Sequence, residues 1–132
     1  MTSSTSSGVV SLRSAHAFAD TLERLLAALA SRGLKVFATI DQQAEAAAVG
    51  LAMPPTTLVL FGNPKAGTPL MLAQPLCALD LPLKLLVTEP VPGEVVVSFN
   101  AAGYVVARHG LPPESAQSLA PAEALIAATV SA

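Results

Sequence analysis

The sequence predicts an α/β (α+β) protein, a two-layer sandwich with a mixed five-stranded sheet and helices mainly on one face. Strand-like segments alternate with segments of helical periodicity along most of the chain, which favours helices packed on one sheet. A turn at residues 90–93 joins two strand-like segments and indicates an antiparallel hairpin, so the sheet is expected to be mixed. The chain has 132 residues, the size of one ordinary domain, and can bury a core without disulfides or metal.

The first strand and the first helix are expected before Gly33. Residues 8–13 form a short strand, and Gly33 suits the left-handed conformation that ends many helices. Between them, apolar side chains recur at helical spacing, at Phe18, Leu22, Leu25, Leu26 and Leu29. This pattern predicts a helix with one face buried against the sheet.

Two more strands flank a short helix. Residues 35–40 alternate and include β-branched side chains, as strands do. Residues 56–61 are apolar almost throughout, which predicts a central strand covered on at least one face. Between these strands, Asp41 is a suitable N-cap for a helix over residues 42–49, closed by Gly50.

The motif FGNPKAGTPLM, at residues 61–71, predicts a turn followed by a helix. The Asn63-Pro64 pair excludes regular helix at its first residue, because the proline ring clashes with a helical neighbour. Thr68 precedes another proline and is a suitable cap, so the helix is expected over residues 69–74.

The second half of the chain is expected to add a hairpin and two helices. Residues 83–88 and 94–99 form the hairpin, around a turn rich in proline and glycine. A short helix is predicted at 101–109 and a last, alanine-rich helix at 121–130.

The charge pattern argues against nucleic acid as a partner. Seven basic and nine acidic residues give a net charge of −2, and no two basic residues adjoin, whereas nucleic acids need a clustered cationic surface. One tyrosine, four phenylalanines and no tryptophan make a stacking platform for single strands improbable. The single cysteine, Cys77, suits a reducing compartment and is expected to be buried and inert.

The chain is expected to be cytoplasmic, with no membrane partner. Residues 1–8 resemble no secretory signal and are predicted to be a disordered polar lead, before a single α/β domain over residues 9–132. No uncharged apolar segment reaches about 18 residues, the length of a membrane span. Only 12% of residues are charged, which fits either a neutral alanine-rich surface or an apolar face covered by a second subunit, so a homodimer is expected.

Four segments resemble a known family. The blocks LERLLAALASRGLKVFATID, FGNPKAGTPLM, LDLPLKLLV and SFNAAGYVVARHGL are similar to the bacterial and archaeal family called domain of unknown function 302, over roughly residues 9–111. The resemblance implies a two-layer α/β fold whose members are often dimeric and whose activity is not established. Members commonly have Asp-His where this chain has Asp41-Gln42, so a role that needed this histidine would be lost here.

The loop from Asn63 to Thr68 is the first candidate for a binding site. A strand-to-helix loop exposes backbone N–H groups that attract anions, and Lys65 would add positive charge. The competing interpretation is a structural turn in which the Asn63 side chain bonds its own backbone. The loop lacks the Gly-Lys-Ser/Thr ending of a phosphate-binding loop.

Four other polar residues are candidates, each with a structural alternative. Asp41 and Asp80 are the best carboxylate pair, although Asp80 also suits a turn or a pair with Lys84. Tyr104 on a helix would pack its ring inward. His109 at a helix end would cap it or lie on the surface.

These observations predict a dimeric module that binds a small ligand in a pocket near the FGNP loop, with no cofactor and no metal. The expected ligand-binding residues are Asp41, Asn63, Lys65, Thr68, Asp80, Tyr104 and His109. Two alternatives stay open. One is an enzyme acting on a small metabolite, with His109 or Asp41 as acid–base, and the other is a protein-interaction domain without a ligand.

Overall fold

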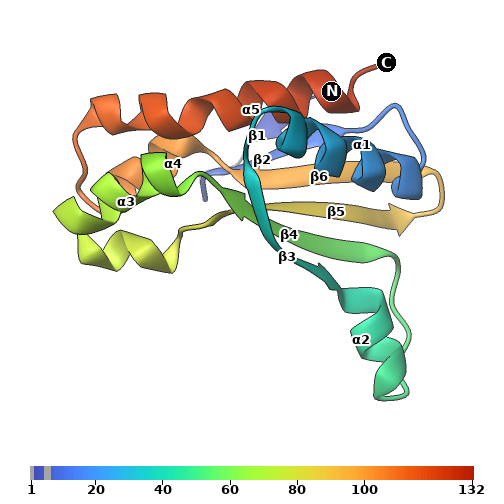
Figure 1. The fold of residues 1–132 in the computed structure, drawn as a ribbon. Helices are drawn as coiled ribbons and strands as arrows, with labels where there is room; N and C mark the ends of the chain where they lie inside the picture. The colour runs from blue at the N-terminus through green and yellow to red at the C-terminus, as the bar shows by residue number, and fades with distance from the viewer. Residues whose placement is uncertain (1, 5–6) are drawn as a thin grey trace.

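A six-stranded sheet runs through the computed structural model, which describes residues 2–4 and 7–132 (Figure 1). Its strands are β1 (Thr2–Ser4), β2 (Val9–Arg13), β3 (Lys35–Asp41), β4 (Thr56–Gly62), β5 (Leu83–Val91) and β6 (Glu94–Asn100). Their spatial order is β1-β2-β6-β5-β4-β3. The apolar segment that was predicted to be central is β4, which pairs with a strand on each side.

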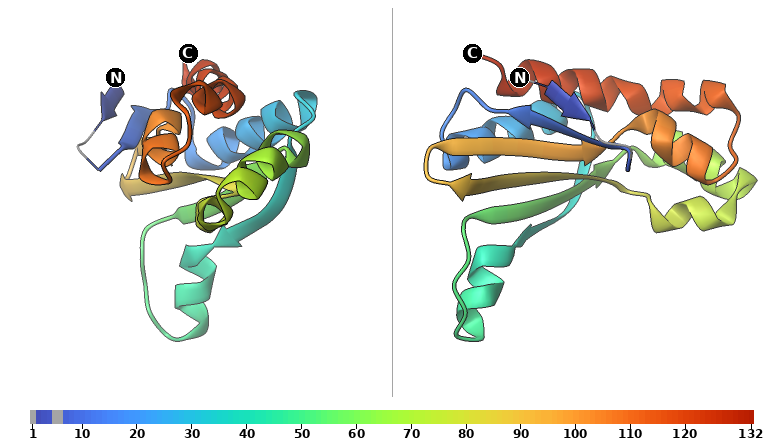
Figure 2. Two further views of the ribbon diagram at one scale, coloured as in Figure 1. Left: turned by 90° about the vertical axis from the view of Figure 1, so that its left-hand side faces the viewer. Right: turned by 180° about the vertical axis from the view of Figure 1, so that it is seen from behind.

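Two helices cover one face of this sheet. The helices are α1 (Phe18–Ser31), α2 (Gln42–Ala48), α3 (Pro64–Ala73), α4 (Ala102–Arg108) and α5 (Ala116–Val130), with 3-10 turns η1 (Pro75–Leu79) and η2 (Pro113–Ser115). Figures 1 and 2 show α1 and α5 above the sheet, α3 and α4 near one end of it, and α2 projecting away on the opposite side. The predicted two-layer α/β architecture is therefore confirmed.

The prediction of a mixed sheet is wrong, because every strand pairing within residues 2–4 and 7–132 is antiparallel. Parallel neighbours need a connection that crosses the sheet. Here α2 lies between the antiparallel neighbours β3 and β4, and α3 with η1 lies between β4 and β5. Each of these helical segments therefore leaves the sheet at the end of one strand and returns at the same end of the sheet. The alternation of strands and helices in the sequence is compatible with such connections as well as with crossovers.

The predicted disordered lead is also revised. Residues 1, 5 and 6 lie outside the described part of the chain. Residues 2–4 form β1, which pairs with β2 and supplies a sixth strand. An edge strand is held by backbone hydrogen bonds, so a polar Thr-Ser segment forms one without an apolar pattern.

The helix after β4 begins earlier than predicted. Asn63, not Thr68, is its N-cap, and the Asn63 side chain accepts a hydrogen bond of 3.0 Å from the Lys65 backbone N–H. Both Asn-Pro and Thr-Pro place a capping side chain before proline at the first helical position. The chain uses the first signal, which leaves Pro69 inside α3. Helix α5 also begins earlier than predicted, at Ala116, and contains Pro121.

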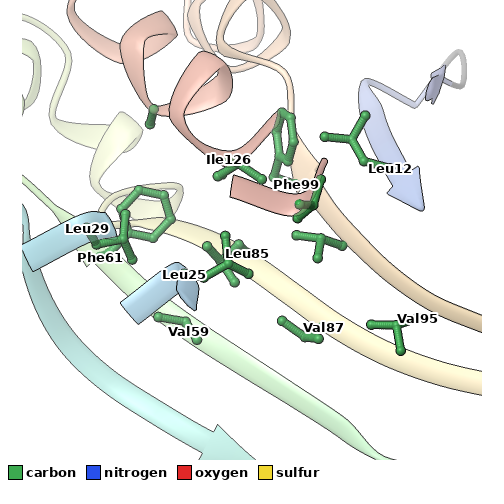
Figure 3. Close-up of a cluster of buried hydrophobic side chains, with 13 residues drawn as sticks. Leu12, Leu25, Leu29, Val59, Phe61, Leu85, Val87, Val95, Phe99 and Ile126 are labelled. Atoms are coloured by element: carbon green, nitrogen blue, oxygen red, sulfur yellow. The ribbon is translucent and has the colours of Figure 1, made fainter. Parts of the chain in front are cut away.

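The core has two parts. The larger joins the inner face of the central strands to α1 and α5, with Leu25, Leu29, Phe61, Leu85 and Ile126 almost fully buried (Figure 3). The smaller lies among α3, η1, α4 and α5. Cys77 is buried in this smaller part, as expected. Burial raises the pKa of its thiol, and the nearby negative charge of Asp80 raises it further.

Candidate functional site

A cavity of about 540 Å³ lies beside the FGNP motif. Its wall is built by the turn after α1, by β3, by the junction of β4 and α3, by the segment that enters β5, and by α5. Most of the wall is apolar and includes Leu34, Phe37, Met71, Leu81, Leu83 and Leu125. The polar side chains among the lining residues are those of Arg32, Asn63, Thr68 and Ser118.

The turn after α1 explains how two lining residues reach the cavity. Gly33 has a φ of +71°, which a residue with a side chain rarely adopts. Gly33 N–H bonds the Ala30 carbonyl and Leu34 N–H bonds the Leu29 carbonyl, at 3.0 Å each, as in a Schellman ending. This reversal fixes Arg32 and Leu34 at the wall.

The FGNP motif supplies the opposite part of the wall. Strand β4 delivers Asn63 to its end, where the side chain caps α3. Asn63 and Thr68 both line the cavity. Lys65 is exposed and is not among the lining residues. The capping bond shows that the structural interpretation of Asn63 also holds.

Asp80 and His109 come together in a separate cluster with Arg108. The Asp80 carboxylate accepts bonds from Arg108 Nη1 at 2.9 and 3.1 Å and contacts His109 Nε2 at 2.6 Å. An ionised carboxylate only accepts, so His109 Nε2–H donates. The side chains of His109 and Asp80 are 7% and 14% exposed. Neither is a lining residue of the large cavity.

Burial raises the pKa of Asp80, but the hydrogen bond from His109 and the positive charges of Arg108 and His109 outweigh it. The pKa of this carboxyl therefore lies below its usual value. Asp80 also borders a second cavity of about 20 Å³, shared with Lys84, Asn100 and Glu123. That volume is enough for about one water molecule and too small for a metabolite.

Asp41 and Tyr104 lie apart from the large cavity. The Asp41 side chain caps α2 by accepting a 2.9 Å bond from Ala44 N–H, as predicted. The Tyr104 ring packs against Gly8 at the start of β2, close enough to leave no room for a Cβ atom there. Gln42 is likewise not a lining residue, so the missing family histidine does not change the wall of this cavity.

Sequence reasoning missed Arg32, Phe37 and the residues of α5. They are distant from the FGNP motif in sequence and reach the cavity only through the packing of α1, β3 and α5 around it. Arg108 was missed as a partner of Asp80, although it directly precedes His109. Within residues 2–4 and 7–132, His, Cys, Asp and Glu side chains form no group of three suited to a metal.

Comparisons with known proteins identify a family and a fold. Residues 10–129 match the family described as "Domain of unknown function DUF302". A crystal structure of an uncharacterized conserved DUF302 protein from Bacillus stearothermophilus has a TM-score of 0.78, with 20% identity, and the match covers 93% of this chain and 95% of that one. In the part of the chain that the structure describes, the helices are too short or too polar to cross a membrane.

Two curated relatives are longer proteins. "Fluoride-specific ion channel FluC 1" of Brucella suis biovar 1 is 40% identical over 111 residues, which is 84% of this chain and 44% of that protein. The protein of the same name from Brucella abortus biovar 1 is also 40% identical over 111 residues, covering 41% of its length. The chain therefore spans less than half the length of these relatives.

Proposed function

The chain belongs to the DUF302 family, whose description assigns no activity, and from the geometry of the pocket we propose that it is a small-ligand-binding module. The observation that carries this proposal is the cavity of about 540 Å³ beside the FGNP motif. Ligand pockets span roughly 300–1,000 Å³ and combine an apolar wall with a few polar groups. This cavity has both properties, and Asn63 and Thr68 are among its polar groups.

The curated relatives support a module that works alongside other protein segments. A segment like this chain is less than half of proteins named as fluoride-specific ion channels. Ligand binding is a property that such a segment can contribute by itself. Fluoride conduction is not part of the proposal, because the name belongs to the longer proteins.

Binding rather than catalysis is proposed because the acid–base candidates lie outside the cavity. His109 is almost fully buried against Asp80, and Asp41 is engaged at the start of α2. A general base must come within hydrogen-bond reach of a bound substrate. Neither residue lines the cavity in which a metabolite would fit.

Replacing Ala66 by phenylalanine should abolish ligand binding. Ala66 lies on α3, lines the cavity and is partly exposed, so a large side chain there fills the cavity while leaving the core intact. In a thermal-shift screen of metabolites, a ligand at a hundredfold excess over its Kd stabilises the wild type by about 2.7 kcal/mol. The A66F variant should show no shift with the same compounds.

Ala73→Phe is the matched control. Ala73 is exposed at the end of the same helix and does not line the cavity, so this variant should keep the wild-type shift. Compounds that stabilise A66F as much as the wild type would place the ligand elsewhere and contradict the proposal.

We further propose that the module is a homodimer formed through the outer face of the sheet. Val59 and Leu85 point into the core, so alternation places Leu58 and Leu86 on the other face. Leu58 lies opposite Ile40 on one side and Leu86 on the other, which makes a continuous apolar row across three strands. Within residues 2–4 and 7–132, no helix covers this face (Figure 1).

The projecting helix α2 supports the same interface. No residue of α2 is buried, and Val49 and Leu51 just beyond it are 72% and 66% exposed. A seven-residue helix has little stability in water without packing. Helix α2 projects on the side of the outer sheet face (Figure 2), where a second copy would cover the apolar row and pack against α2.

Light scattering at micromolar concentration should give twice the chain mass of 13.4 kDa. Leu86→Lys should halve the measured mass, because it places a charge in the proposed interface. Val91→Lys, at the exposed end of the same strand, should leave the mass unchanged. A wild-type mass of one chain would overturn the dimer and leave the pocket unaffected.

A further inference from the structure

The only charge on the wall of the large cavity, among the described residues, is positive. Arg32 is the one charged residue among those that line it, and it is exposed, so its guanidinium lies at the rim. Arg32 makes no ion pair or side-chain hydrogen bond with any residue that the structure describes. Lys35 lies near the same wall, with Nζ 5.0 Å from the centroid of the Phe37 ring, and Phe37 lines the cavity.

The acidic residues next to lining residues in sequence are already engaged. Asp80 accepts hydrogen bonds from Arg108 and His109. Glu123 accepts a 2.7 Å bond from the Ala102 backbone N–H. No carboxylate among the described residues lines the large cavity, so its rim has a positive charge that no protein group neutralises.

The apolar wall favours an apolar ligand, whereas the unpaired guanidinium of Arg32 favours an anion. A carboxylate inside an apolar cavity would lose its hydration without compensation, which is strongly unfavourable. At the rim the carboxylate keeps part of its hydration. The planar guanidinium can also donate two parallel, charge-assisted hydrogen bonds to it. The body of the ligand, in contrast, gains free energy from each apolar group that it buries.

We propose that the pocket binds an amphipathic monoanion, a molecule with an apolar body and one carboxylate, with Arg32 holding the carboxylate. The apolar body lies between α3 and α5, against Met71, Leu81 and Leu125. Arg32 follows the last residue of α1, and its side chain has no hydrogen-bond or ion-pair partner among the described residues, so it can turn to the ligand. This proposal rests on the proposed ligand-binding function and names the class of ligand.

The experiment compares decanoate, 1-decanol and decylamine as probes by titration calorimetry at low salt and neutral pH. Decanoate should bind about tenfold more tightly than decanol, the difference that a charge-assisted pair at a partly solvated site contributes. Decylamine should bind least. Arg32→Gln should remove the preference for decanoate and leave the decanol affinity unchanged, whereas Arg32→Lys should restore part of it.

Arg24→Gln is the matched control. Arg24 is an exposed arginine on α1 that pairs with Asp20 and lies outside the cavity, so its loss should change no affinity. Equal affinities for decanoate and decanol in the wild type, or an Arg32→Gln variant that keeps the preference, would overturn the proposed ligand class. If the wild type binds decanol and the A66F variant does not, the cavity is still the binding site, and only the proposed preference for a carboxylate is wrong.

Discussion

Replacing Gly8 by alanine should destabilise the protein by about 2–5 kcal/mol, of which about 1–2 kcal/mol is backbone strain and about 1–3 kcal/mol is overpacking. Gly8 has a φ of +85°, and an added Cβ atom would lie 2.2 Å from Cγ of Tyr104. Turning the ring cannot relieve the overlap, because Cβ of Tyr104, which is fixed to the backbone of α4, would still lie 2.6 Å from the added atom. The Gly8 carbonyl also accepts a 2.8 Å bond from Ala101 N–H, so the change disturbs the junction of β2 and α4.

Gly93→Ala separates the two contributions. Gly93 has a φ of +86°, almost the same as Gly8, but nothing lies within 4 Å of its added Cβ atom. Urea denaturation at neutral pH should therefore show a much smaller loss for Gly93→Ala, limited to backbone strain. Equal losses in the two variants would mean that Tyr104 does not pack against Gly8. The ring would then be free for the ligand contact considered from the sequence.

The elements of the fold could be predicted because local signals define them. Apolar spacing defines α1, Asp41 caps α2, and the apolar segment before Asn63 forms β4. The strand pairing could not be predicted in the same way. Whether a helix crosses the sheet or returns at the same end depends on contacts between distant segments, so the alternation of elements was compatible with a mixed sheet.

The candidate site could likewise be predicted only where its residues belong to one local motif. Asn63 and Thr68 belong to one short motif, and they meet at the cavity. Asp80 and His109 were selected separately, and the structure joins them to each other but not to that motif. Arg32 carries no sequence signal at all, because its position at the rim follows from how α1 packs and reverses at its end. Composition and spacing describe such a residue only as one more scattered charge.

Replacing Asp80 by asparagine should lower the free energy of unfolding by about 1.5–3 kcal/mol at pH 7, the range for hydrogen bonds to charged groups. The change removes the carboxylate that accepts bonds from Arg108 and His109. The His109 ring is 7% exposed, so little water can replace the lost partner, whereas Arg108 is half exposed and can be solvated. Asp20→Asn is the matched control, because the Asp20–Arg24 pair is exposed on both sides and is worth at most about 1 kcal/mol.

The pH dependence follows from the direction of the Asp80 pKa shift. Because this pKa is lower in the folded protein than its ordinary value of 3.8, the unfolded chain takes up the proton first as the pH falls. The contribution of the ionised carboxylate to the free energy of unfolding is complete when the pH is above that ordinary value. It is lost as the pH falls through the lower pKa of the folded protein. Urea denaturation between pH 6 and pH 2 should therefore show the wild type approaching Asp80→Asn at the acid end of the range. A constant difference between the two proteins across this range would show that the ionised carboxylate does not stabilise the cluster, and Asp80 would then be available for another role.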